Sequence, residues 1–241
     1  LPVPGARLRV LDVPPVAASS AEVVQRLRAY DDAAGLISRA EAQYIAENGL
    51  YQPDYEALLK ARGMPEKRLL HTLGVRRTAA ALAGLHGARM QAAGVAAMLH
   101  DIAKPLPLPE MQKKAQEYGL RLPKDIYADE NLLHGPVAAA IAEHELGILD
   151  REILSAIACH TIGKPDMTVL EQVIYLADAI EPTRRDYPGL AQIRALAQTD
   201  LSAAVLLSMQ RTREYVLSQG HAFCPQTELA MQSLAAKEEI K

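Results

Sequence analysis

Six residues whose side chains can bind metal ions are spread over more than a hundred positions, each on a segment with helical character: His71, His100, Asp101, His134, His160 and Asp178. The adjacent pair at 100–101 closes an almost wholly apolar helix predicted over 92–102. A carboxylate beside an imidazole costs free energy to bury there unless both groups are paired. A metal ion is the simplest partner for such a pair.

The residue types narrow the choice of metal. Imidazole and carboxylate ligands together suit zinc, iron, manganese, cobalt or nickel better than calcium. Four of the residues can serve one ion: His71, His100, Asp101 and Asp178. If Asp101 bridges, His134 and His160 can hold a second ion, and two metals sharing a water would supply hydroxide and clamp phosphate oxygens. Spacing alone leaves a one-metal and a two-metal centre both open. The other histidines are expected to be ordinary surface or core residues: His86, His144 and His221.

The segments that must position these side chains are almost all helical from residue 54 onward. Apolar spacing and helix-end signals predict helices over 54–62, 66–85, 92–102, 110–118, 136–146, 151–159, 168–180, 192–197, 201–219 and 227–237. Pro136 suits the first turn of its helix, and three nearby prolines predict a loop directly after Asp101. The predicted fold class is all-α, a helical bundle with a small N-terminal appendage.

The first fifty residues differ from this pattern. Proline residues enclose the segment 8–11, which predicts a short strand. Ser19 or Ser20 can cap a helix that runs to about Tyr30. A second helix is predicted over 39–48, where the following glycine suits its end. We therefore expect the appendage to consist of one short strand and two helices.

The composition excludes several classes of function. Lys and Arg number 26 against 29 Asp and Glu, so no basic excess indicates a nucleic-acid partner. No apolar run approaches the length of a membrane span, and no signal peptide is visible. The two cysteines, Cys159 and Cys224, do not suggest a disulfide framework and fit a reducing cytoplasm. Because the chain starts with Leu rather than Met, we expect it to be a fragment or a processed product.

The candidate ligands and the residues around them resemble the HD-domain metal-dependent phosphohydrolases and, among these, the YqeK family of bacterial HD proteins. The matching stretches are 71–75 (HTLGV), 99–105 (LHDIAKP), 132–137 (LLHGPV), 160–165 (HTIGKP), 175–182 (YLADAIEP) and 187–189 (YPG). The resemblance covers residues 54–241. It implies a helical HD fold with two divalent metal ions, often assigned as iron, held by all six residues with Asp101 as the bridge. The implied activity is symmetrical hydrolysis of diadenosine tetraphosphate to two ADP.

The same resemblance implies roles for residues beyond the ligands. Lys104 falls on a lysine expected to contact phosphate, and Arg184 or Arg185 falls on an arginine suited to binding phosphate oxygens. Thr161 and Lys164 are candidate substrate contacts near the second metal, with loop capping as the alternative. In the implied mechanism a metal-bridging hydroxide attacks a phosphorus atom, while the lysine and the arginine neutralise charge on the oxygens.

The N-terminal segment resembles a different family. Residues 19–27 (SSAEVVQRL) and 44–51 (YIAENGLY) are similar to the C-terminal end of a nicotinate-nucleotide adenylyltransferase. Ala21 and Val24 stand where that family uses Thr and Arg to bind phosphates, so no transferase activity is expected here. We therefore predict a transferase-like remnant over 1–53 and an HD phosphohydrolase domain over 54–241. We also expect a fused nucleotidyltransferase domain upstream, with a generic linker as the alternative.

Two other functions stay open from the sequence. The same fold could serve a nucleoside mono- or triphosphate phosphohydrolase with one metal ion. A non-catalytic alternative is a nucleotide-sensing domain fused to a nucleotidyltransferase, although the complete ligand set argues against it. The expected partner is a nucleotide or dinucleoside polyphosphate substrate, with no nucleic acid and no membrane. A homodimer is also left open.

Overall fold

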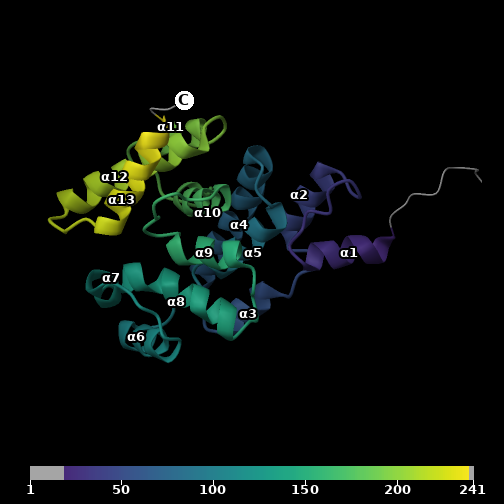
Figure 1. Cartoon of the computed structure of the whole chain (residues 1–241), viewed down its shortest axis with the longest axis horizontal. Helices are drawn as coiled ribbons and strands as arrows, with labels where there is room; N and C mark the ends of the chain where they lie inside the picture. The colour runs from purple at the N-terminus through teal and green to yellow at the C-terminus, as the bar shows by residue number, and fades with distance from the viewer. Residues whose placement is uncertain (1–18, 239–241) are drawn as a thin grey trace, which may run out of the picture.

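The computed structural model describes residues 19–238, and every regular element within this range is a helix (Figure 1). The helices of this range are α1 (Ser20–Arg28), α2 (Arg39–Asn48), α3 (Tyr55–Ala61), α4 (Glu66–His86), α5 (Met90–Leu99), α6 (Leu108–Glu117), α7 (Lys124–Ala128), α8 (Glu130–His144), α9 (Arg151–Cys159), α10 (Val169–Ile180), α11 (Leu190–Leu196), α12 (Leu201–Ser218) and α13 (Pro225–Glu238). The all-α prediction is confirmed. The strand predicted over 8–11 lies outside the described residues.

Helices α4, α5, α9 and α10 form the centre of the molecule. α4 packs along α5 and α10, and α9 contacts α5, α8 and α10. Every residue of α5 is buried, because its small side chains let neighbouring helices approach closely on all sides. At Gly94, an added Cβ atom would lie 3.0 Å from the Ala46 carbonyl oxygen, so a larger residue would push α2 away.

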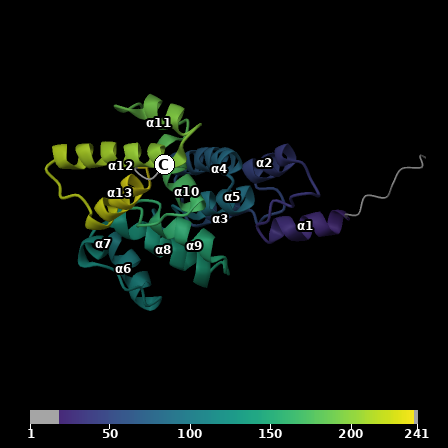
Figure 2. The ribbon, with the colours of Figure 1, turned by 45° about the horizontal axis from the view of Figure 1, so that its top comes forward.

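Three peripheral groups of helices surround this centre. α6 and α7 pack on α8, α11 and α12 pack on each other and on α10, and α13 packs on α12. Helix α2 packs on α4 and α5, and α1 continues outward from it. Figure 2 shows that α1 and α2 lie at the end of the molecule opposite α12 and α13. The central helices are therefore covered on several sides, which keeps their polar residues away from bulk water.

The segment between α1 and α2 is tied to the start of α5. The Asp32 carboxylate accepts hydrogen bonds from the backbone N–H groups of Met90 and Gln91, at 2.9 and 2.8 Å. Asp32 thus satisfies two of the free N–H groups that every helix start exposes. The Gln91 side chain donates to the carbonyl of Ala42, which belongs to the main core. Ala42 and Ala46 of α2 therefore pack into the main core, whereas Leu27, Ala33 and Ile45 form a small cluster of their own. The predicted domain division stays a prediction.

Helix α8 differs from the sequence prediction. It begins at Glu130, and Pro136 lies inside it rather than in its first turn. The Asp129 side chain caps the helix by accepting from the N–H of Asn131 at 2.8 Å. Leu133 and Val137 are both buried, so packing on each side of Pro136 outweighs the backbone hydrogen bond that a proline removes.

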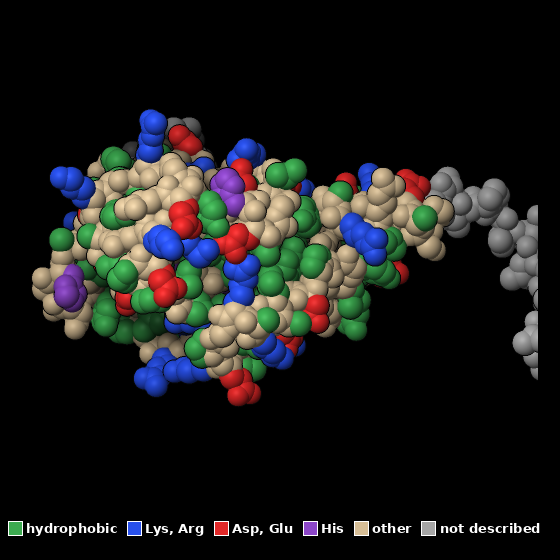
Figure 3. All heavy atoms as spheres, turned by 90° about the horizontal axis from the view of Figure 1, so that it is seen from below, with side chains coloured by type: hydrophobic (Ala, Val, Ile, Leu, Met, Phe, Trp, Pro, Cys, Tyr) green, Lys and Arg blue, Asp and Glu red, His purple; other side chains and the backbone are tan. Residues whose placement is uncertain are grey.

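The surface carries charges of both signs. On the face drawn in Figure 3, Lys and Arg side chains lie among Asp and Glu, without an extended patch of one sign. A basic stripe of the kind that follows a nucleic-acid backbone is not visible on that face. Within residues 19–238, no helix combines the length and the apolar character needed to cross a membrane.

Candidate metal centre

The helices bring all six sequence-predicted ligands together in the centre of the molecule. They come from α4 (His71), the residues after α5 (His100 and Asp101), α8 (His134), the residue after α9 (His160) and α10 (Asp178). Their ligand atoms form three groups, and the atoms of each group lie within 4.8 Å of one another. The groups are His71–His100–Asp101, His100–His160–Asp178 and Asp101–His134–His160. Because the groups share members, the six residues form one continuous cluster.

Two of the histidines are held by the same local contact at a helix end. His100 Nδ1 lies 2.6 Å from the Ala97 carbonyl oxygen, and His160 Nδ1 lies 2.8 Å from that of Ile157. A ring nitrogen that donates to a carbonyl carries the proton, which leaves Nε2 with a free lone pair. After α5, the His100 ring occupies the Ala97 carbonyl oxygen, which a further helical turn would need as a backbone acceptor. The helix ends at Leu99, whereas the sequence predicts an end at residue 102.

His71 is oriented by a carboxylate that the sequence analysis did not single out. Glu181 Oε1 lies 2.9 Å from His71 Nδ1 and accepts from the Thr183 hydroxyl at 2.6 Å. Burial raises the pKa of Glu181, but the hydrogen bonds from Thr183 and His71 outweigh it and lower the pKa overall. An ionised carboxylate at Nδ1 fixes the proton there and directs the lone pair of Nε2 into the cluster.

Two nitrogens of the cluster are buried without a hydrogen bond within the described part of the chain: Nε2 of His71 and Nε2 of His100. The first lies 2.9 Å from Asp178 Oδ1 and the second 3.4 Å from Asp101 Oδ2, but neither contact has hydrogen-bond geometry. Buried polar atoms in proteins are nearly always satisfied. Imidazole nitrogens with free lone pairs beside carboxylates match the donor set of a divalent transition metal. The residues present therefore fit a metal centre.

The α8–α9 end of the cluster consists of two facing imidazoles. Nε2 of His134 and Nε2 of His160 lie 3.0 Å apart, and the Thr161 hydroxyl lies within 3.3 Å of both. Burial, together with the imidazoles of His134 and His100, lowers the pKa of His160 to about 3, so this ring is neutral at pH 7. With one ring proton between them, these two nitrogens form a hydrogen bond, and a cation in place of that proton would meet the lone pairs of both rings. This end of the cluster is therefore suited to binding a cation.

Asp101 connects the two ends of the cluster. Its Oδ2 lies 3.4 Å from His100 Nε2 and 2.7 Å from the Arg68 guanidinium, while its Oδ1 lies 3.3 Å from His134 Nε2. Burial raises the pKa of Asp101, but the adjacent imidazoles, His100 first among them, hold it well below its usual range. A buried, ionised carboxylate whose oxygens face two groups of imidazoles has the arrangement of a bridging ligand.

Lys104 and Thr161 are two of the predicted substrate contacts that the structure places beside the cluster. Lys104 Nζ lies 3.2 Å from Asn131 Oδ1 and 3.4 Å from His134 Nδ1. Burial lowers the pKa of Lys104, although the charge of Asp101 opposes this effect. A lysine held by a neutral amide rather than by a carboxylate keeps its charge available for a phosphate group.

The remaining predicted contacts differ in their partners. Arg184 donates to Asp178 twice, from Nη2 to the carboxylate at 2.5 Å and from Nε to the backbone carbonyl at 2.6 Å. Arg185 is exposed. Lys164 pairs with the buried carboxylate of Glu171 at the start of α10, at 2.7 Å. The role of Lys164 as a substrate contact stays a prediction.

Three residues of the site were not singled out from the sequence: Arg68, Asn131 and Glu181. Arg68 precedes His71 by three residues on α4, and Glu181 follows Asp178 by three at the end of α10. Residues three apart lie on one face of a helix. Helical spacing from the ligands could therefore have indicated both.

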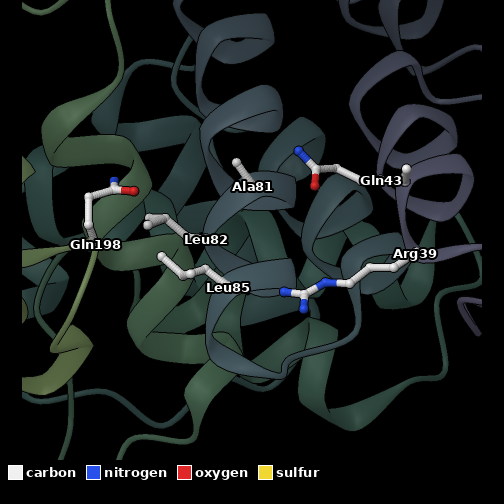
Figure 4. A pocket seen from close by; sticks show the side chains of 7 residues that line it. Arg39, Gln43, Ala81, Leu82, Leu85 and Gln198 are labelled. Atoms are coloured by element: carbon white, nitrogen blue, oxygen red, sulfur yellow. The ribbon is translucent and has the colours of Figure 1, made fainter.

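An open groove on the surface lies apart from the cluster. It is lined by residues of α2 and α4 and by Gln198, which precedes α12 (Figure 4): Arg39, Ala40, Gln43, Ala81, Leu82, Leu85 and Gln198. None of these residues belongs to the six ligands or to the cations beside them. The groove and the cluster therefore have no residue in common.

Comparisons with known proteins place this arrangement in a family. The model of the HD domain matches residues 68–183, which contain all six cluster residues. The chain is 41% identical over 164 residues to the symmetrical bis(5'-nucleosyl)-tetraphosphatase of Halalkalibacterium halodurans, covering 68% of this chain and 87% of that protein. The chain therefore belongs to the HD-domain family, in the branch that contains this symmetrical bis(5'-nucleosyl)-tetraphosphatase.

A solved structure and a longer relative extend the comparison. A protein from Clostridium acetobutylicum, described as a "predicted HD superfamily hydrolase involved in NAD metabolism", matches with a TM-score of 0.69 at 32% identity, covering 84% of this chain and 100% of that one. A Mycoplasma genitalium protein named "Probable nicotinate-nucleotide adenylyltransferase/Ap4A hydrolase" is 32% identical over 187 residues, which cover 75% of this chain and 51% of that protein. This name joins the two families that the two parts of the sequence resemble.

Proposed function

We propose that this chain is a metal-dependent nucleotide phosphohydrolase that cleaves diadenosine tetraphosphate symmetrically into two ADP. The observation that carries the proposal is the buried cluster of six ligands, in which two imidazole nitrogens lack hydrogen bonds among the described residues. Cationic side chains beside the cluster suit a phosphate-rich substrate. The names of the relatives from Halalkalibacterium halodurans and Mycoplasma genitalium support the same substrate.

The proposed cofactor is a pair of divalent metal ions, with iron as the leading candidate and manganese, cobalt, nickel or zinc as alternatives. Four residues would hold the first ion: His71, His100, Asp101 and Asp178. Two more would hold the second ion with Asp101 shared: His134 and His160. When bound, such ions lower the pKa of water and neutralise phosphate oxygens. Asp101 belongs both to the group with His71 and His100 and to the group with His134 and His160, which supports its shared position.

The protein side chains have separate tasks in this proposal. Glu181 holds His71 in the tautomer that presents Nε2 as a ligand. Lys104, held by Asn131, neutralises charge on phosphate oxygens from the α8 side of the cluster. Arg184 neutralises charge on phosphate oxygens from the Asp178 side of the cluster. The exposed Arg185 is the alternative residue for this role.

Charge balance favours a polyphosphate substrate over an uncharged one. Three negative and three positive side chains lie in or beside the cluster: Asp101, Asp178 and Glu181, and Arg68, Lys104 and Arg184. Two divalent ions would add positive charge to a site that is already balanced. Unbalanced charge is costly in a partly buried site. A chain of four phosphates offsets this excess, so the loaded site would attract it.

We also propose a role for the N-terminal segment and a location for the protein. The N-terminal segment over 1–53 would be the end of an adenylyltransferase-like domain, which the name of the Mycoplasma genitalium relative supports. A nucleotidyltransferase would then be fused to the phosphohydrolase, as the sequence predicts. Cys159 and Cys224 are both free thiols, which fits the proposed cytoplasmic location.

The test uses purified protein loaded with Mn²⁺, Fe²⁺ or Co²⁺ and supplied with diadenosine tetraphosphate. We expect ADP as the sole nucleotide product on chromatography. ATP together with AMP would reveal asymmetrical cleavage, and no product from protein with verified metal content would contradict the proposal. AMP and ATP are supplied in parallel, because preferred hydrolysis of either would favour a mono- or triphosphate phosphohydrolase.

A further inference from the structure

Arg68 connects the outside of the molecule to the buried bridge of the cluster. Its Nη1 donates to Asp101 Oδ2 at 2.7 Å. The Arg68 side chain is 37% exposed, whereas the Asp101 side chain is 4% exposed. The guanidinium therefore borders the cluster with one edge on the carboxylate and another edge accessible to solvent.

The Arg68 guanidinium has more N–H donors than its contact with Asp101 uses. An arginine side chain carries five N–H donors in a planar fork. Among residues 19–238, the carboxylate of Asp101 is the one hydrogen-bond acceptor of the Arg68 side chain. The other donors suit an anion with several oxygens, since guanidinium binds phosphate through two parallel hydrogen bonds.

Arg184 forms the matching contact on the other carboxylate of the cluster. Its side chain is also 37% exposed and donates to Asp178 Oδ1. His100 Nε2 lies between the two carboxylates, 3.4 Å from Asp101 Oδ2 and 3.8 Å from Asp178 Oδ1. The two guanidinium groups are therefore anchored on different carboxylates of the cluster, and His100 Nε2 lies near both carboxylates.

We propose that Arg68 binds a phosphate of the polyphosphate chain on the side of the cluster opposite Arg184. Symmetrical cleavage of a tetraphosphate leaves two phosphates on each side of the broken bond. A guanidinium on each side would hold both halves of such a chain, so Arg68 would select four phosphates over three. This inference rests on the proposed function. A purely structural role, in which Arg68 only neutralises Asp101, is the competing explanation.

The experiment compares Arg68→Ala, Arg68→Lys and Arg68→Gln with the matched control Arg77→Ala, an exposed arginine on the same helix. Glutamine can still donate to Asp101 but carries no charge, so it separates phosphate binding from support of the carboxylate. Metal content, the Kd of ADP in equilibrium dialysis, and KM and kcat for diadenosine tetraphosphate and triphosphate are measured. Circular dichroism verifies that each variant is folded.

We expect the alanine and glutamine variants to retain the metal content of the unaltered protein. Their Kd for ADP and their KM for the tetraphosphate should rise by about tenfold to a hundredfold, the effect of losing one charge-assisted contact. Their preference for the tetraphosphate over the triphosphate should shrink, and lysine should restore part of the loss. Arg77→Ala should match the unaltered protein.

Loss of metal with an unchanged Kd for ADP in the loaded fraction would overturn the inference, and so would an unchanged Kd and KM at full metal content. The binding measurement does not require turnover. If the unaltered protein released no ADP from diadenosine tetraphosphate, the proposed function would fail, while the Kd of ADP would still decide the role of Arg68.

Discussion

The two ends of the cluster are organised differently. The α4–α10 end comprises His71 and Asp178, and each of these ligands contacts a charged side chain. Glu181 contacts His71, and Arg184 contacts Asp178. At the α8–α9 end, two imidazole nitrogens face each other at 3.0 Å, and the carboxylate nearby is the shared Asp101. Charged protein groups therefore hold the first end, whereas a hydrogen bond between two imidazoles holds the second, and a cation could replace the shared proton there.

The shared carboxylate offers the largest effect, because it serves both ends. In Asp101→Asn, we expect metal content to fall below one ion per chain and ADP release to fall on the order of 10³-fold. Elemental analysis and the rate of diadenosine tetraphosphate hydrolysis measure these changes. Asp125→Asn, at an exposed position on α7, is the control. Two retained ions with a nearly unchanged rate would show that Asp101 does not bridge.

Metal binding at the two ends can be tested separately by removing the ligands of the α8–α9 end. His134→Ala combined with His160→Ala should reduce the metal content from two ions to one, since the ligands of the α4–α10 end keep their protein contacts. The rate should fall by about 10²-fold or more, because one ion no longer neutralises the phosphate oxygens. Elemental analysis counts the ions. Loss of both ions together would mean that the ends do not bind independently.

A smaller effect is expected from the residue that orients the first end. Glu181→Gln keeps the shape of the side chain but removes the charge that fixes the proton on His71 Nδ1. We expect the affinity for the first ion to fall by about tenfold to a hundredfold. Competition with a chromophoric chelator measures this affinity. Unchanged affinity would show that Thr183 and Glu181 serve the end of α10 rather than the metal centre.

The smallest effect comes from an ion network outside the cluster, which has paired charges but no proposed metal. Burial raises the pKa of Glu145, but contacts from Lys114, Tyr118 and Arg62 outweigh it and lower the pKa to about 2. Because this value lies below the unfolded value of 4.5, Glu145 stabilises the fold above pH 4.5, and this contribution disappears as the pH falls toward 2. Solvent screening limits it to about 1 kcal/mol.

The measurement for this network is the free energy of unfolding in urea at pH 7, 4.5 and 3. In Glu145→Gln the part of the pH dependence that belongs to Glu145 should be absent, while metal content stays unchanged. Parallel pH profiles of the variant and the unaltered protein would contradict the assigned pKa. A change in metal content would show that the network is coupled to the cluster.

The sequence predicts the helical fold and three residues of the cluster for the same physical reason. His100, Asp101 and Asp178 lie on or directly after strongly apolar helices, where polar side chains need partners. Their presence there indicates a site before any coordinates are known. The facing pair His134 and His160 could not be recognised by spacing, because their contact depends on how α8 packs against α9.

The rest of the site depends on packing that composition does not encode. Arg68 and Glu181 are ordinary charged residues near helix ends, where exposure is the usual expectation. Only the approach of α4 to α5 and α10 turns them toward Asp101 and His71. Lys164 is an example of the opposite outcome. It lies close to His160 in sequence, but its ammonium group pairs with Glu171 of α10.

In the proposed site, six residues hold two divalent ions with Asp101 shared between them. The most direct test is a crystal of the metal-loaded protein, with anomalous scattering measured on both sides of the metal absorption edges. We expect two anomalous peaks within the cluster, both in contact with Asp101, one reached by His71 and the other by His134 and His160. A single peak, or peaks away from these side chains, would contradict it.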